Sequence, residues 1–102
     1  MDDVQAERDK FLANLDKFRT NLFDLHSFAH NAEISEWPTP EQRAKLSEAQ
    51  KMLSCADTEL ALVDTEVKKE PVPKGPVTHK MQTIFVLVDQ ARKLLEDVAP
   101  AN

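Results

Sequence analysis

The residues best suited to metal chemistry are two histidines in one predicted helix. His26 and His30 are four residues apart, so on an α-helix both rings lie on one face and could hold an ion together. The patterns that usually complete such a site are missing, because the chain contains neither His-Glu-x-x-His nor Cys-x-x-Cys. We therefore expect no metal and no cofactor, and both histidines remain candidate contacts to a partner.

Catalytic chemistry has equally little support. Cys55 is the one cysteine, and a nucleophilic thiol needs a nearby base, but no histidine is close to it in the sequence. Four carboxylates follow it in a pattern typical of a solvated helix flank: Asp57, Glu59, Asp64 and Glu66. We therefore expect that the protein is not an enzyme.

Composition narrows the class of protein. The chain has 102 residues and a net charge of −5, which indicates one domain and argues against direct binding to nucleic acid. The longest apolar run, residues 84–88, is far below the roughly 20 residues of a membrane span. The N-terminus lacks the features of a signal peptide, and the single cysteine favours a reducing compartment. These features predict an intracellular, cytoplasmic protein.

A repeated spacing of apolar residues predicts the fold. In three segments these residues recur at alternating steps of three and four, which gives a helix one continuous apolar side. The positions are Phe11, Leu15, Phe18, Leu22, Leu25, Ala29 and Ala32, then Leu46, Ala49, Leu53, Ala56, Leu60, Val63 and Val67, then Val77, Met81, Ile84, Val88, Ala91, Leu95 and Val98. We predict helices at about 3–33, 40–69 and 77–98. Because short connections favour antiparallel neighbours, the fold expected over 1–102 is a single all-α domain, an antiparallel up-down-up three-helix bundle with heptad-type seams.

Local signals support these helices. Thr39, Pro40 and Gln42 form the pattern of a capping box with proline at the first helical position. Residues 84–88 could form a strand, but strong helix formers flank them, so we predict helix. Carboxylates beside the second apolar side are expected to pair with cations on the other two helices, which are Arg19, His26, Lys80 and Arg92.

The unequal helix lengths predict where a partner binds. The helix at 77–98 is shorter than the first, so it should end roughly 12 Å early and leave a two-helix groove with Phe28, Ile34, Trp37 and Leu46. Alternatively, Trp37 and Ile34 fold over this end as a plug. Phe23 lies on an adjacent stripe with His26 and His30. The predicted partner-binding residues are Phe23, His26, Phe28, His30, Ile34, Trp37 and Leu46.

A second surface is predicted on the outer side of the helix at 77–98. Val86 falls opposite the apolar seam, with Phe85 and Leu87 on its two shoulders. Either both shoulders pack into the core, or this helix mediates a homodimer.

Together these features favour a non-enzymatic protein-interaction module, an adaptor or regulatory subunit that binds a helix or peptide of another protein. The alternative is an acidic inhibitor whose carboxylates at positions 57, 59, 64 and 66 block a basic or nucleic-acid-binding surface. No motif in the chain identifies a family.

Overall fold

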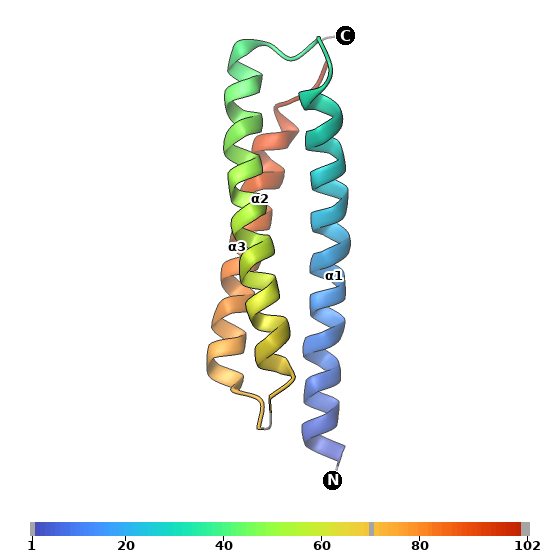
Figure 1. Cartoon of the computed structure of the whole chain (residues 1–102), viewed down its shortest axis with the longest axis vertical. Coiled ribbons are helices and arrows are strands. Elements are labelled where there is room, and N and C mark those ends of the chain that lie inside the picture. Colours follow the sequence, from blue (N-terminus) through green and yellow to red (C-terminus); the bar gives the residue numbers. More distant parts are fainter. Residues whose placement is uncertain (1, 70, 101–102) are drawn as a thin grey trace.

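The computed structural model describes residues 2–69 and 71–100, with side chains described from Gln5 onward. It contains three helices, α1 (Asp2–Glu33), α2 (Pro40–Val67) and α3 (Lys74–Glu96), and each packs against the other two. In Figure 1, α1 and α3 run in one direction and α2 runs in the other. The bundle is elongated, with extents of 56 × 18 × 17 Å. The prediction of an all-α three-helix bundle is confirmed, and residues 84–88 are helical.

The core consists of apolar side chains contributed by all three helices. Every apolar position noted in the second and third segments is buried, including Val98 just beyond the end of α3. On α1, by contrast, Phe11, Phe18 and Leu25 are only partly buried. No polar or charged side chain is buried among the described residues, so hydrophobic burial is the main force that holds the bundle together.

The start of α2 follows its local sequence. The Thr39 hydroxyl oxygen accepts a hydrogen bond of 3.1 Å from the Gln42 backbone N–H, and the Gln42 side-chain oxygen accepts one of 2.9 Å from the Thr39 backbone N–H. Pro40 occupies the first helical position, where its missing N–H costs nothing. The predicted capping box is confirmed.

The ends of α2 and α3 differ from the predictions. α2 ends at Val67 and α3 covers Lys74–Glu96, instead of 40–69 and 77–98. The first bond within α3 runs from the Val77 N–H to the Pro73 carbonyl, at 3.0 Å. Pro76 therefore lies among the first residues of the helix, whose N–H groups need no helical partner, and it does not delay the helix start.

Candidate protein-interaction surfaces

The α1–α2 edge is closed by polar contacts at regular intervals. Arg19 pairs with Asp64 at 2.8 Å, His26 with Asp57 at 2.8 Å, and the Gln50 side-chain amide donates to Glu33 at 3.0 Å. Each step of seven residues forward along α1 is a step of seven backward along α2. This spacing is that of two antiparallel helices in heptad register. We call these three contacts the polar ladder.

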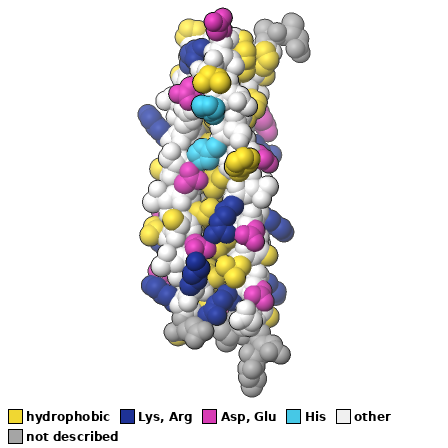
Figure 2. Space-filling model, turned by 45° about the vertical axis from the view of Figure 1, so that its right-hand side comes forward, with side chains coloured by type: hydrophobic (Ala, Val, Ile, Leu, Met, Phe, Trp, Pro, Cys, Tyr) yellow, Lys and Arg dark blue, Asp and Glu magenta, His cyan; other side chains and the backbone are white. Residues whose placement is uncertain are grey.

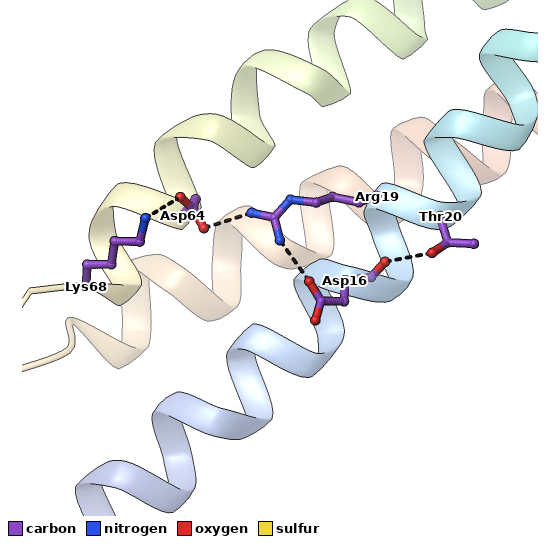
Figure 3. Close-up of polar contacts among 5 residues, drawn as sticks. All are labelled: Asp16, Arg19, Thr20, Asp64 and Lys68. Carbon is purple, nitrogen blue, oxygen red and sulfur yellow. Dashed lines mark hydrogen bonds and ion pairs between the residues drawn. The ribbon is translucent and has the colours of Figure 1, made fainter.

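Figure 3 shows the Arg19 rung of the polar ladder in detail. The guanidinium of Arg19 reaches from α1 to Asp64 on α2 and also contacts Asp16 at 2.9 Å. Lys68 approaches the other oxygen of Asp64 at 3.0 Å. The hydrogen bonds from Lys68 and Arg19 hold the pKa of Asp64 below its ordinary value. Asp64 is thus kept ionised and engaged.

The predicted pairing of opposite charges is confirmed in part. Arg19 and His26 pair with carboxylates of α2 as expected. Arg92 instead pairs with Asp89 on its own helix, and no ion pair between Lys80 and α2 is found in the described part of the chain. Arg19 and His26 on α1 therefore connect α1 to α2. Within the described residues, Lys80 and Arg92 on α3 form no ion pair with α2.

The α1–α3 edge is more open. Between the described residues of these two helices, the ion pair from Lys74 to Glu7, at 2.7 Å, lies at the extreme end of the edge. Farther along, the edge presents the partly buried Phe11, Phe18 and Leu25. Three surface hollows follow one another along it, each lined by side chains from both helices.

The hollow at the C-terminal end of α3 is the most apolar candidate site, and we call it the Phe28 groove. It has a volume of about 350 Å³ and is lined by Asp24, Leu25, Phe28, Arg92, Leu95, Glu96, Val98 and Ala99. Phe28 is 42% exposed although it borders the core residues Leu95 and Val98. An aromatic ring in this position offers a partner apolar contact area.

Charges on the rim of the Phe28 groove are mostly acidic. Asp24 and Glu96 contribute carboxylates, and Arg92 contributes the one cation among the lining residues. Arg92 is held by Asp89, and its nearest approach to Glu96 is 3.9 Å. Asp24 forms no ion pair within the described residues. The rim therefore keeps unneutralised negative charge.

The groove expected between helices 1 and 2 at this end is filled, which corrects the prediction. The chain continues past α3, and the Gln42 side-chain amide donates to the carbonyls of Asp97 at 3.2 Å and Ala99 at 3.0 Å. Lys45 pairs with Asp97 at 2.9 Å, and this hydrogen bond raises the pKa of Lys45. Val98 is fully buried. The segment after α3 thus covers the gap that helix lengths alone left open.

The residues predicted for that groove are therefore separated. Leu46 is 3% exposed and belongs to the core, so it offers no contact to a partner. Ile34 is 69% exposed, and Trp37 is 37% exposed. Ile34 does not act as a plug, because most of its surface faces solvent. Of this group, only Phe28 lines the groove observed at this end.

In the stripe of Phe23, His26 and His30, the first and last side chains are exposed and His26 is half-buried, and none of the three lines a described hollow. Figure 2 turns the α1 side of the molecule forward and shows two neighbouring histidines in its upper half, with hydrophobic side chains in small groups among charges of both signs. His26 is engaged with Asp57, and Phe23 is 71% exposed. No group of three potential metal ligands occurs among residues 2–69 and 71–100. The stripe therefore lacks the shape of a preformed site.

On the outer side of α3, one of the two residues beside Val86 packs into the core as predicted, and the other does not. Leu87 packs against the core, but Phe85 remains 61% exposed and Val86 49% exposed. The two shoulders of Val86 are not equivalent because α3 packs mainly on α2 and much less on α1. Phe85 faces the open α1–α3 edge, where it lines two of the hollows.

Three of the four carboxylates on the acidic flank of α2 are engaged by side chains of this protein. His26 engages Asp57, Arg19 and Lys68 engage Asp64, and Lys69 engages Glu66 at 2.9 Å. This arrangement disfavours the alternative of an acidic inhibitor that uses the flank.

Within the described ranges, none of the helices combines the length and apolar character required to cross a membrane. Comparison of the chain with protein-family models, curated proteins and solved structures returned no match. The interpretation of the surfaces therefore depends on their physical chemistry.

Most residues of the Phe28 groove were not predicted from the sequence. Asp24, Leu95 and Ala99 were not candidates because the helix lengths placed the open surface between helices 1 and 2. One signal was present, since the apolar spacing continues to Val98, past the last residue of α3. An apolar residue beyond a helix end, in register with the helix, indicates that the following segment still packs on the core.

Proposed function

We propose that this chain is a non-enzymatic protein-interaction module and that its Phe28 groove binds an amphipathic helix of a partner protein. The observation that carries the proposal is the partial exposure of Phe28 in a hollow floored by Leu25, Leu95 and Val98. Water in contact with this surface is released when an apolar side chain of the partner enters, which favours association.

The backbone of this protein favours a helical occupant. All described elements are helices, and their backbone hydrogen-bonding groups are used within the helices themselves. The described chain thus offers no sheet edge to which a peptide strand could be added. A helix lying in a groove is a common mode of peptide recognition that needs only side-chain contacts.

The rim of the groove defines the chemistry of the occupant further. Asp24 and Glu96 leave negative charge beside the apolar floor, so a Lys or Arg next to the apolar anchor gains attraction and an acidic residue loses it. The expected partner helix is therefore apolar on one side and basic beside it. We place this interaction in the cytoplasm, where the exposed thiol of Cys55 stays reduced.

Two synthetic helical peptides test the proposal. Both carry Leu and Phe on one side, one with Lys flanks and one with Glu flanks, and each is added to isotopically labelled protein observed by NMR. We expect the Lys peptide to shift the amide signals of Phe28, Leu95 and Ala99, and the Glu peptide to bind at least about tenfold more weakly. Equal binding of both peptides, or shifts located elsewhere, would contradict the proposal.

A matched pair of variants provides the control. Phe28→Ser removes the exposed ring of the groove, whereas Phe23→Ser removes an even more exposed ring that lines none of the described hollows. Loss of a central aromatic contact weakens binding by about tenfold or more. We expect this loss for Phe28→Ser alone, and equal losses for both variants would refute the assignment.

A further inference from the structure

The three hollows on the α1–α3 edge are joined through the residues that line them. The hollow of about 310 Å³ at the centre, which we call the middle hollow, shares Asp24, Leu25 and Arg92 with the Phe28 groove. It also shares Phe85 with a third hollow of about 540 Å³, which lies toward the N-termini of α1 and α3. We call the three together the α1–α3 groove. An occupant of the Phe28 groove can therefore continue along this edge of the bundle.

The residues that line the α1–α3 groove repeat with the spacing of a coiled coil. On each helix they recur at alternating steps of three and four residues, the spacing by which one helix contacts another along its length. In both helices, residues that pack on the core alternate with exposed ones. On α1 the positions are Phe11, Asn14, Phe18, Asn21, Leu25 and Phe28, and on α3 they are Thr78, Met81, Phe85, Val88, Arg92 and Leu95. Both helices thus present a seam to the position that a fourth helix would take.

Two asparagines occupy this seam on α1, one heptad apart. Asn14 and Asn21 are exposed, and their side-chain amides form no hydrogen bond with any described residue. In coiled coils, an asparagine at a seam position fixes the register of the helices that meet there. The two amides are therefore available to polar side chains of an occupant.

Charge beside the α1–α3 groove changes sign from one end to the other. Lys10, Lys17 and Asp24 follow one another at steps of seven, so they lie on one line along α1. Both lysines are exposed and form no ion pair within residues 2–69 and 71–100. At the other end, Asp24 and Glu96 leave the negative charge that borders the Phe28 groove. The rim is thus basic toward the N-terminus of α1 and acidic toward its C-terminus.

Other charges beside the groove are paired within the protein. Glu7 pairs with Lys74 at the end near the N-terminus of α1, and Asp89 on α3 pairs with Arg92 and Lys93. An occupant would have to break these pairs to use the charges. The side chains that remain for a partner are therefore the two lysines of α1 and the two carboxylates at the other end.

We infer that the partner helix continues from the Phe28 groove along the whole α1–α3 groove as a fourth helix of the bundle, with basic residues beside Asp24 and Glu96 and acidic residues beside Lys10 and Lys17. A helix that carried one sign of charge throughout would be repelled at one end. The distance from Phe11 to Phe28 along α1 is about 26 Å, so the occupant needs about 18 residues. This inference rests on the function proposed for the Phe28 groove and adds the length and charge order of the partner.

Three helical peptides of about 21 residues, or three heptads, test the inference. All have the same first half, with Leu and Phe on one side and Lys flanks. The second half of the first peptide continues the apolar side with Glu flanks. The second peptide has Ala in place of the apolar residues of that half, and the third has Lys in place of its Glu flanks. Each is titrated into isotopically labelled protein observed by NMR.

The first peptide should bind at least about tenfold more tightly than the second, because only the first fills the whole groove. It should shift the amide signals of Asn14, Phe18 and Phe85 as well as that of Phe28. The third peptide should bind about threefold to tenfold more weakly than the first, because its second half lies beside lysines.

A charge reversal on the protein provides the matched control. Lys17→Glu should weaken binding of the first peptide by about threefold to tenfold and strengthen binding of the third. No charged residue lies three or four positions from Lys17, so the variant leaves α1 intact. Lys51→Glu makes the same change at an exposed site of α2, two residues from the buried Ala49 and Leu53 and thus on the opposite side of that helix. It should affect neither peptide.

The outcomes separate this inference from the function on which it rests. Equal binding of the first two peptides, with shifts restricted to the Phe28 groove, would overturn the inference and leave the proposed function standing. No binding of any peptide would overturn both. Equal effects of Lys17→Glu and Lys51→Glu would overturn the charge order. Shifts of Asn14, Phe18 and Phe85 on concentrating the protein alone would assign the groove to a second copy and overturn the inference as well.

Discussion

Two positions near the centre of α3 offer the sharpest test of how this chain folds. Ile84 is completely buried, whereas Val86 is 49% exposed. On an α-helix, residues two apart point in nearly opposite directions, but on a strand they share one face. Shortening each side chain to alanine therefore separates the helical bundle from any arrangement in which residues 84–88 form a strand.

The expected magnitudes follow from burial. Ile84→Ala deletes three buried carbons, worth about 2.4 kcal/mol at about 0.8 kcal/mol each, and the cavity left behind raises the loss to about 3–4 kcal/mol. A domain of this size has a total stability of about 5–15 kcal/mol, so this variant should melt about 15 °C or more below the wild type. Val86→Ala should change the free energy of unfolding by less than about 0.5 kcal/mol, and alanine is also the better helix former.

Urea unfolding followed by far-ultraviolet circular dichroism measures both variants. The slope of the free energy against urea should stay the same, so that only the midpoint moves. Similar losses for Ile84→Ala and Val86→Ala would refute the helical arrangement of this segment. A small loss at both positions would show that α3 does not pack as described.

Further predictions concern the polar ladder and the cap of α2. A double-mutant cycle with Arg19→Ala and Asp64→Ala, measured by urea unfolding, should give a coupling energy of about 0.2–1 kcal/mol, the range of exposed ion pairs. A coupling energy of zero would show that this ion pair does not stabilise the fold. Because Lys68 and Arg19 lower the pKa of folded Asp64, its contribution to stability is present above the ordinary carboxyl pKa of about 4 and is lost as the pH falls through the lowered value. Asp64→Asn should therefore reduce the loss of stability in acid, as measured by urea unfolding at a series of pH values, and an unchanged acid profile would contradict the assignment. Thr39→Ala should cost about 1 kcal/mol and Thr39→Ser much less, because serine keeps the capping oxygen; equal losses by thermal unfolding would show that the capping bond is not what stabilises α2.

The core could be predicted from the sequence because burial follows helical periodicity. Ile84 and Val88 are buried while Val86 between them is half exposed, as the spacing alone indicates. The cap at Thr39 could also be predicted from the sequence, since its two hydrogen bonds join residues only three apart. Features that depend on a few consecutive residues, or on one helix face, are encoded locally.

The open edge of the bundle was not encoded in this way. The exposure of Phe85 depends on how α3 divides its contacts between α1 and α2, and the spacing along one helix does not specify that division. The early start of α3 depended on Pro76 being tolerated near the N-terminus of a helix. The burial of Val98 depended on a non-helical segment that Gln42 holds in place. Each of these results comes from contacts between segments far apart in the chain.

The regular spacing of the polar ladder restricts how this protein can change in length. Inserting a single residue in α1 between Arg19 and His26 would rotate everything beyond it by about 100° and carry His26 away from Asp57. Adding a whole heptad to α1 would preserve the rotation but would leave one rung without its counterpart unless α2 grew by the same amount. We therefore expect relatives of this protein to differ from it by paired insertions or deletions of seven residues in α1 and α2, with irregular changes restricted to the connections between helices.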